Sequence, residues 1–496
     1  MLDFAVVVMV VIYGLALSFV LFHSLSDAHL IYHYVISSRK KKHTPDPIYF
    51  EPYVTIQLPV YNELYVVERL IDAVAAIDYP REKLEIQVLD DSTDETTEVI
   101  AGKVSCLQKR NINIQHIRRT NREGFKAGAL KHGLGLAKGE LISIFDADFL
   151  PSKDFLKKTL PFFNAADVGM VQTKWGHINK HSSLLTSLQA IALDGHFSIE
   201  QTGRNAAGYF INFNGTGGVW RKECIIDAGN WQADTLTEDL DLSYRAQLKG
   251  WKFIYLEDVV TPAELPPLVS AFKTQQYRWA KGGAETARKN LKKVLLSHLP
   301  LSVRWHGLFH LIYSFGFVSI IISMVLSVPL ILVRKHYPQY DTFFTATGII
   351  TISFLIYIIH YFISYTKNAS GSFGGKILGF IIRFPLFISL FIGVSLNNAI
   401  GIIKGYSGIK SGFVRTPKFN TASVANKFYK NKYNQIKIDG ITVMEGILIL
   451  YFLFAIILSF RFQDHWMIPL YVIAVIGFSI VFISSIRERK IMLKKT

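Results

Sequence analysis

The sequence predicts a chain with two parts, an α/β domain built on a largely parallel sheet and an α-helical membrane domain. Short apolar strands alternate with amphipathic helical patterns in the first part, which is typical of βαβ units. Long uncharged runs fill the C-terminal part, and a soluble core does not need apolar segments of that length. Basic residues crowd beside these runs, as they do in the loops of membrane proteins.

Composition narrows the class of protein. The 496 residues leave room for a soluble domain and a membrane domain, and half of them are hydrophobic. A net charge of +16 would favour binding of nucleic acid, of anionic lipid or of a phosphorylated substrate. The basic clusters at 39–42 and 487–495 flank apolar runs and no nucleic-acid-binding signature is present, so we expect a lipid bilayer and no nucleic acid as partner. Two cysteines, Cys106 and Cys224, are too few for a disulfide framework, and we expect both to be inert.

The N-terminal segment, residues 1–38, is predicted to be a membrane helix. Residues 4–22 carry no charge and are long enough to cross the hydrocarbon layer. Asp3 precedes them and no small-residue cleavage site follows, so we expect a retained anchor rather than a cleaved signal peptide. The basic residues at 39–42 place the following domain in the cytoplasm. Three prolines within 44–53 make a stiff linker.

The α/β domain is expected at 50–285. Its strands are predicted at 54–58, 86–89, 112–117 and 141–145, with helical patterns between them. This alternation predicts a mainly parallel sheet.

The membrane domain is expected at 286–496. Uncharged runs lie at 305–333, 343–365, 446–460 and 466–486. The segment 377–403 could also span. In that case two basic regions, residues 404–442 and the tail after Ile486, would lie outside. Because positive loops prefer the cytoplasm, we predict five spanning helices in the whole chain and an interfacial segment at about 373–403.

Acidic residues follow two of the predicted strands: Asp90, Asp91, Asp146 and Asp148. The carboxyl ends of strands in an open α/β sheet form a ligand crevice. Clustered carboxylates repel one another unless cations or hydrogen-bond donors neutralise them. A hard divalent ion takes oxygen ligands and often keeps phosphate oxygens, which suits a nucleotide diphosphate. The alternative is that these aspartates only cap helices, which suits Ser92 and Asp94.

A third acidic group lies at Thr237-Glu238-Asp239. Thr237 is expected to be the N-cap of a helix that ends near Lys249-Gly250, with Glu238 stabilising its first turn. Asp239 is the candidate general base, because transfer of a sugar to a hydroxyl requires removal of its proton.

The run Gln275-Gln276-Tyr277-Arg278-Trp279 combines groups suited to a sugar phosphate. The guanidinium of Arg278 can grip a diphosphate, Gln275 can hydrogen-bond its oxygens, and the indole of Trp279 offers a platform for a sugar ring. The alternative is an interfacial helix whose arginine meets lipid phosphate. A glycine-bearing loop at 212–221 would let the backbone approach a sugar closely.

Four of these motifs together resemble the processive branch of glycosyltransferase family two, the cellulose and hyaluronan synthase group. They are Asp90-Asp91, the Asp-x-Asp at 146–148, Thr237-Glu238-Asp239 and Gln275-Gln276-x-Arg278-Trp279. The resemblance covers about residues 50–285. It is closer still to the cellulose synthase-like A and C subgroup, which includes mannan and glucomannan synthases, at 87–94, 124–130 and 213–216.

The resemblance implies a cytoplasmic GT-A (Rossmann-like) domain that catalyses inverting transfer from a nucleotide sugar. It assigns the donor to Glu63, Asp90, Asp91, Lys126, Asp146, Gln275, Arg278 and Lys418. A divalent metal ion, Mg²⁺ or Mn²⁺, would bind Asp148 and Asp146. Asp239, with Glu238, would be catalytic, and Trp279 would support the acceptor. Residues 413–418 are similar to the gating loop of cellulose synthases, expected at about 405–440, with Thr416 and Lys418 reaching the diphosphate, although Pro417 departs from the usual pattern.

We therefore expect an integral, multi-pass membrane enzyme that extends a β-mannan, glucomannan or β-glucan and passes it across the membrane. Its partners would be GDP-mannose or UDP-glucose and a glycan acceptor. It would lie in the plasma membrane of a bacterium or a Golgi-type membrane of a eukaryote. The alternatives are a transferase that adds one sugar to a lipid and a non-catalytic scaffold that binds nucleotide.

Overall fold

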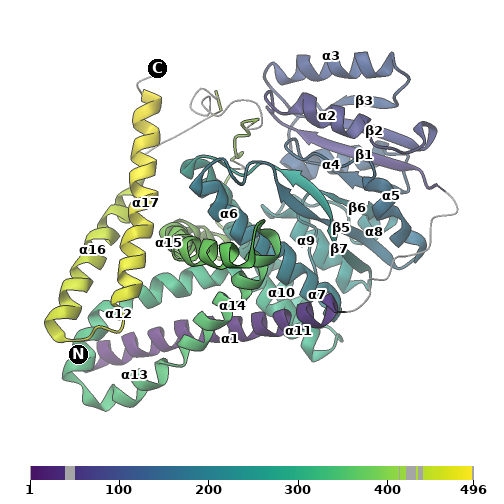
Figure 1. The fold of residues 1–496 in the computed structure, drawn as a ribbon. Helices are drawn as coiled ribbons and strands as arrows, with labels where there is room; N and C mark the ends of the chain where they lie inside the picture. The colour runs from purple at the N-terminus through teal and green to yellow at the C-terminus, as the bar shows by residue number, and fades with distance from the viewer. Residues whose placement is uncertain (1, 40–50, 413, 421–431, 434–438, 494–496) are drawn as a thin grey trace.

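A computed structural model describes residues 2–39, 51–412, 414–420, 432–433 and 439–493 (Figure 1). Several predicted features lie outside these residues: the basic residues 40–42, most of the linker at 44–53, and, within the expected gating loop, residues 413, 421–431 and 434–438.

One mixed sheet forms the centre of the described α/β domain. Its strands are ordered β3-β2-β1-β4-β6-β5-β7. The first four along the chain pair in parallel, β6 is antiparallel to both β4 and β5, and β7 is parallel to β5. The bounds are β1 Val54–Val60, β2 Leu84–Asp90, β3 Ile114–Arg118, β4 Leu141–Ile144, β5 Val168–His177, β6 Gly218–Arg221 and β7 Lys252–Ala263. The predicted parallel α/β architecture is confirmed, and β5 to β7 extend it.

Helices cover both faces of the sheet because alternate strand residues point to opposite sides. On one face Ile56, Val88 and their neighbours pack against α2 (Val67–Ala75), α3 (Thr96–Gln108) and α5 (Phe155–Thr159). On the other face Ile142 and Trp220 pack against α4 (Phe125–Leu136), α8 (Lys222–Asp227) and α9 (Glu238–Leu248). Every residue of β2 is buried, as expected for a strand covered on both sides.

The remaining helices form the membrane domain and its junction with the sheet. Their bounds are α1 Leu2–Ser38, α6 Leu184–Gly195, the π-helical segment His196–Gln201, α7 Thr202–Ala207, α10 Val269–Leu295, α11 Leu301–Ile312, α12 Gly316–His336, α13 Asp341–Thr347, α14 Ile350–Asn368, α15 Phe373–Tyr406, α16 Gly440–Phe462 and α17 Ile468–Leu493. Among the described residues, six helical segments are long and apolar enough to cross a membrane, which supports a multi-pass membrane protein. They are Asp3–Ser38, Leu301–His336, Pro338–Asn368, Phe373–Tyr406, Gly440–Phe462 and Ile468–Leu493.

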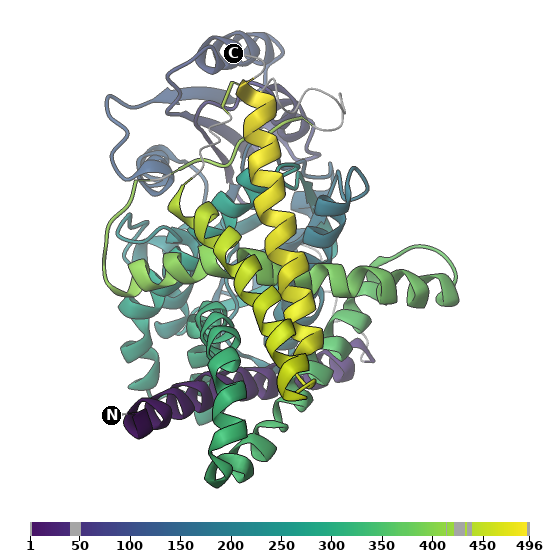
Figure 2. The ribbon, with the colours of Figure 1, turned by 90° about the vertical axis from the view of Figure 1, so that its left-hand side faces the viewer.

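One of the six, α15, covers the segment that we expect to be interfacial. It runs across α17 rather than along it (Figure 2). The two helices touch through glycines: a Cβ added to Gly393 would lie 2.3 Å from the Gly477 carbonyl oxygen, and one added to Gly477 would lie 2.0 Å from that of Ser389. Because α15 and α17 run in different directions, they cannot both lie parallel to the membrane normal. The interfacial placement of residues 373–403 stays a prediction.

Candidate active site

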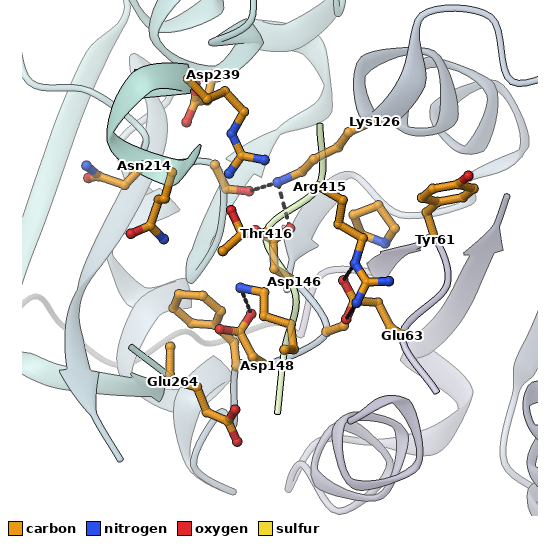
Figure 3. A pocket seen from close by; sticks show the side chains of 18 of the residues that line it. Tyr61, Glu63, Lys126, Asp146, Asp148, Asn214, Asp239, Glu264, Arg415 and Thr416 are labelled. Carbon is orange, nitrogen blue, oxygen red and sulfur yellow. Dashed lines mark hydrogen bonds and ion pairs between the residues drawn. The ribbon is translucent and has the colours of Figure 1, made fainter. Parts of the chain in front are cut away.

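The sequence motifs converge on one open cavity at the carboxyl ends of β1 and β4 (Figure 3). Its walls come from the sheet, the start of α9, the first turns of α10 and the segment 414–420. The lining includes all the predicted site residues except Asp90, namely Glu63, Asp91, Lys126, Asp146, Asp148, Glu238, Asp239, Gln275, Arg278, Trp279 and Lys418.

Asp90 lies behind the wall of the cavity. Its carboxylate accepts hydrogen bonds from His116 Nε2 at 2.9 Å and from the Ser92 backbone N–H at 2.8 Å. Burial raises its pKa, but these hydrogen bonds outweigh burial and hold it below the usual value. Asp91 is the member of the pair that lines the cavity, and its carboxylate is gripped by Arg119 at 2.8 and 2.5 Å. Asp90 therefore supports the wall, and Asp91 faces the ligand side.

The predicted metal ligands each hold a lysine. Lys126 Nζ lies 2.6 Å from Asp146 Oδ1, and Lys418 Nζ lies 2.8 Å from Asp148 Oδ1 (Figure 3). Burial lowers the pKa of each lysine, but the facing aspartate and other nearby acids raise the pKa by more than burial lowers it. The net pKa is therefore raised, and both ammonium groups stay charged. Asp148 is almost fully buried. Two carboxylates that already hold cations, one of them shielded from water, are the hard oxygen ligands that a divalent ion prefers. The residues present therefore fit such an ion.

Asp239 and Glu238 begin α9 and face the same cavity. Burial raises the pKa of Asp239 to about 7, and the negative charge of Glu238 adds to the rise, while Lys126 opposes it. A carboxylate with a pKa near neutrality is well matched to the work of a general base. Thr237 holds the N-cap position, as predicted, but its hydroxyl does not cap the helix; it pairs with Thr286 Oγ1 at 3.0 Å.

The helix α10 contributes Gln275, Arg278 and Trp279 to the wall of the same cavity. Burial lowers the pKa of the Arg278 guanidinium, while Glu238 and Asp146 oppose that change. The ring of Trp279 lies 6.5 Å from that of Trp175 at the end of β5. A cationic group and an aromatic wall therefore stand side by side in one cavity.

Two cationic residues of the cavity were not among the predicted site residues. Arg415 pairs with Glu63, Nε to Oε1, at 3.2 Å. Burial raises the pKa of Glu63 to about 7, and Arg415 and Lys418 oppose the rise. Arg122 lies over the ring of Tyr61, 3.3 Å from its centroid. The only sequence signal for Arg415 is its place between Phe413 and Lys418, and Arg122 has none.

The comparisons with known proteins agree with this geometry. Residues 52–282 match the family model described as "Glycosyltransferase like family 2". The chain is 40% identical over 282 residues to glucomannan 4-beta-mannosyltransferase 1 of Oryza sativa subsp. japonica, covering 56% of this chain and 53% of that protein. It is 41% identical over 278 residues to glucomannan 4-beta-mannosyltransferase 2 of Arabidopsis thaliana, covering 55% and 51%. The chain thus spans about half the length of the curated relatives it matches.

The fold has a counterpart among solved structures. A mannosyltransferase from Pyrobaculum calidifontis, in complex with GDP-Man and Mn²⁺, superposes with a TM-score of 0.51 at 19% identity, covering 70% of this chain and 98% of that one. The match shows a shared fold. The predicted resemblance to glycosyltransferase family two and its cellulose synthase-like subgroup is confirmed by the family model and the curated relatives.

Proposed function

Because residues 52–282 form a domain of glycosyltransferase family two, we propose that the chain transfers a mannosyl or related hexosyl group from a nucleotide sugar to a growing β-glycan. The relatives' names specify mannosyl transfer to glucomannan, which favours GDP-mannose over UDP-glucose as the first donor to test.

The observation that carries this proposal is convergence. Asp148, Asp239 and Trp279 come from three segments spread over 131 positions of the sequence, and all three line one cavity. A scaffold that merely bound nucleotide would need neither a buried carboxylate with a pKa near 7 nor an indole lining the same cavity.

The residues divide the reaction between them. Asp239 accepts the proton of the acceptor hydroxyl while that oxygen bonds to the anomeric carbon of the donor, and the bond from that carbon to the diphosphate breaks with inversion. Arg278 and Gln275, with the two lysines, hold the departing diphosphate, and Trp279 supports the acceptor sugar. Asp146 and Asp148 would hold a divalent ion, which, when bound, supplies positive charge against the leaving group.

The membrane helices bear on where the reaction takes place and on how the product leaves. We propose that the α/β domain lies in the cytoplasm and that the product leaves through the membrane domain as it grows, since α10, which carries Trp279, packs against α15 and α17. A transferase acting once on a lipid would not need to pass its product across the bilayer.

The decisive experiment is a donor panel on the purified full chain in nanodiscs. Nucleotide release is measured with GDP-mannose, GDP-glucose and UDP-glucose, and the product is sized. We expect one donor to give a β-linked polymer, with Asp239→Asn inactive. A product of one sugar on lipid would replace the polymerase assignment with the glycolipid one, and no turnover with any donor would refute the proposal.

A further inference from the structure

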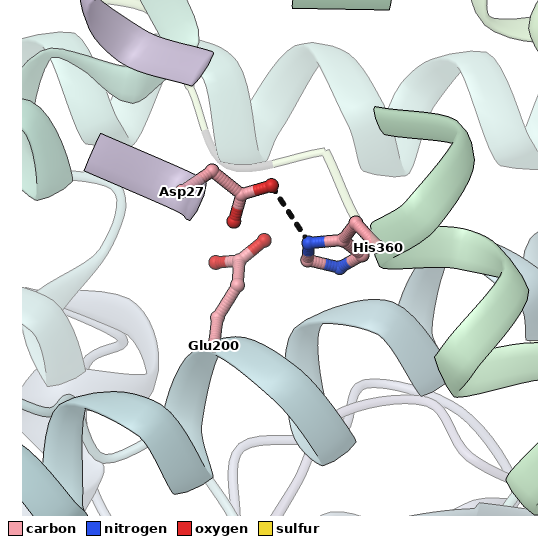
Figure 4. A group of neighbouring side chains, drawn as sticks. All are labelled: Asp27, Glu200 and His360. Atoms are coloured by element: carbon pink, nitrogen blue, oxygen red, sulfur yellow. Dashed lines mark hydrogen bonds and ion pairs between the residues drawn. The ribbon is translucent and has the colours of Figure 1, made fainter. Parts of the chain in front are cut away.

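Three titratable side chains meet at the junction between the α/β domain and the membrane helices (Figure 4). They are Asp27 of α1, Glu200 of the π-helical segment and His360 of α14, and their carboxylate and ring atoms lie within 4.8 Å of one another. Asp27 and His360 belong to candidate membrane spans, where ionisable groups are costly and usually functional. None of the three lines the cavity described above.

The charges of this cluster are balanced by the protein itself. His360 Nδ1 lies 2.8 Å from Asp27 Oδ2. Glu200 Oε2 accepts from Arg204 Nη1 and from His196 Nδ1, each at 3.1 Å. Burial raises the pKa of Glu200, but the hydrogen bond from His196 and the charge of Arg204 outweigh burial and hold it well below its usual value. A divalent ion would have to compete with Arg204 and with the proton on His360. The arrangement therefore favours two ion pairs, Asp27–His360 and Glu200–Arg204, over a metal site. The two pairs are coupled by the charge of His360 acting on Glu200, and together they are called the network below.

The network continues toward the cavity through His196. With Nδ1–H donating to Glu200, His196 Nε2 accepts from the Asn214 side-chain amide at 3.2 Å. The other end of that amide, Oδ1, accepts from Gln201 Nε2 at 2.9 Å. Both ends of the Asn214 side chain are therefore held by one π-helical turn, a conformation that is frequent at functional sites.

Asn214 and Gly215 form part of the cavity wall beside the candidate base. The Gly215 carbonyl accepts from Lys126 Nζ at 2.9 Å, and that lysine is the partner of Asp146. A Cβ on Gly215 would lie only 2.8 Å from Asp239 Oδ2, and the backbone there has a φ of +81°. A small displacement of Asn214 would therefore move both Lys126 and the space beside Asp239.

We propose that Asp27, Glu200 and His360 are positioning residues: through His196 they hold Asn214 and Gly215 against the candidate base, so that the packing of α1 and α14 sets the geometry of transfer. This inference rests on the proposed function for its catalytic consequence, but its structural content can be measured without turnover. An error of about 1 Å in the position of reacting groups can cost on the order of 10²-fold in rate.

The test cuts the network on either side of Glu200. His360→Gln removes the membrane end, and His196→Leu removes the link to Asn214. The matched control is Ser353→Ala, since Ser353 accepts from Ser24 Oγ at 2.8 Å and joins the same two helices without touching the network. Amide hydrogen exchange over residues 212–217 and the kcat and donor KM are measured for the full chain in nanodiscs.

We expect both network variants to exchange faster over 212–217, and to lower kcat by about 10- to 100-fold with donor KM changed less than about threefold. The control should match the wild type in both readouts. Unchanged exchange in His360→Gln and His196→Leu would overturn the inference, whatever the activity. A stoichiometric metal ion that His360→Gln loses and Asp148→Asn retains would overturn it in favour of a metal site. If the wild type turns over no nucleotide sugar, the proposed function fails while the exchange measurement still decides the inference.

Discussion

The raised pKa of Asp239 makes the proposed base testable through pH. Only the ionised carboxylate accepts a proton, and burial with the charge of Glu238 raises its pKa from 3.8 to about 7. At pH 6 about one tenth of the enzyme would then be active, so kcat/KM should fall about tenfold per pH unit below 7 and level off above it. Asp239→Asn should lower kcat by about 10²- to 10⁴-fold at pH 8, and the rate that remains should not fall between pH 7 and pH 5 because Asn does not titrate.

The same shift has a consequence for stability, with the opposite sign. A raised carboxyl pKa means that the folded state disfavours the charged form, so ionisation destabilises the wild type as pH rises from about 4 to 7. About three pKa units correspond to roughly 4 kcal/mol at pH 8, as an upper bound because Glu238 and Lys126 share the titration. Asp239→Asn should therefore raise the Tm at pH 8 and lose most of that gain by pH 5.

The assay is nucleotide release from pH 5 to 9 with thermal unfolding of the same preparations, and Asp227→Asn, at an exposed carboxylate at the end of α8, serves as control. A wild-type rate that stays flat from pH 8 to pH 5, or an Asp239→Asn enzyme with more than about a tenth of the wild-type kcat, would refute the assignment of the base.

Three further predictions follow from the charged and aromatic contacts. Lys273→Met leaves the buried Glu445 carboxylate without its partner at 2.7 Å, so it should destabilise the protein by about 3–5 kcal/mol, and Lys273→Met/Glu445→Leu should recover most of that loss in thermal unfolding. Removal of divalent ions with a chelator should abolish turnover, with Mn²⁺ or Mg²⁺ restoring the wild type but not Asp148→Asn; full activity in the chelator would exclude a metal role. Trp279→Ala should shorten the product, seen by size chromatography, while donor KM changes less than about threefold; a large rise in donor KM would instead place the indole on the donor.

The sequence predicted the parallel part of the sheet because its signals are local. Strand β2 alternates the apolar residues Leu84, Ile86 and Val88 with polar ones and ends at Asp90, and the apolar strand before Asp146 is equally clear. Strands β5, β6 and β7 were not among the predicted strands, since β6 has only four residues and lies next to glycines. Its antiparallel pairing depends on partners far away in the chain, which no local pattern encodes.

The sequence predicted those site residues whose type is unusual for their position. It did not predict those whose role depends on a side chain far away in the sequence. Adjacent acids at strand ends drew attention to Asp90 and Asp91 alike. Only the fold shows that Asp90 is hydrogen-bonded to His116, whereas Asp91 lines the cavity. Likewise, Arg415 becomes meaningful only when the segment 414–420 lies beside β1, more than 350 positions earlier in the sequence.

The charges around the cavity bear on the proposed divalent ion. Seven acids line it, namely Glu63, Asp91, Asp146, Asp148, Glu238, Asp239 and Glu264, against five cationic side chains, namely Arg122, Lys126, Arg278, Arg415 and Lys418. Two of the acids are paired with arginines outside the lining, Asp91 with Arg119 and Glu264 with Arg69. The remaining five acids face the five cationic groups, and two of them, Glu63 and Asp239, have pKa values raised to about 7.

A diphosphate brings further negative charge into a cavity whose two lysines are already paired with Asp146 and Asp148, and the bond that breaks concentrates that charge on the leaving group. The lysines cannot turn to the phosphate without leaving Asp146 and Asp148 unpaired, which is costly for a carboxylate as buried as Asp148. A divalent ion on the two aspartates would remove that conflict, because it would replace the lysines as their partner and free Lys418 for the diphosphate. The ion and Lys418 should then act together: Lys418→Met should weaken donor binding strongly in saturating metal, whereas a lysine that merely neutralised Asp148 would become dispensable once metal was bound.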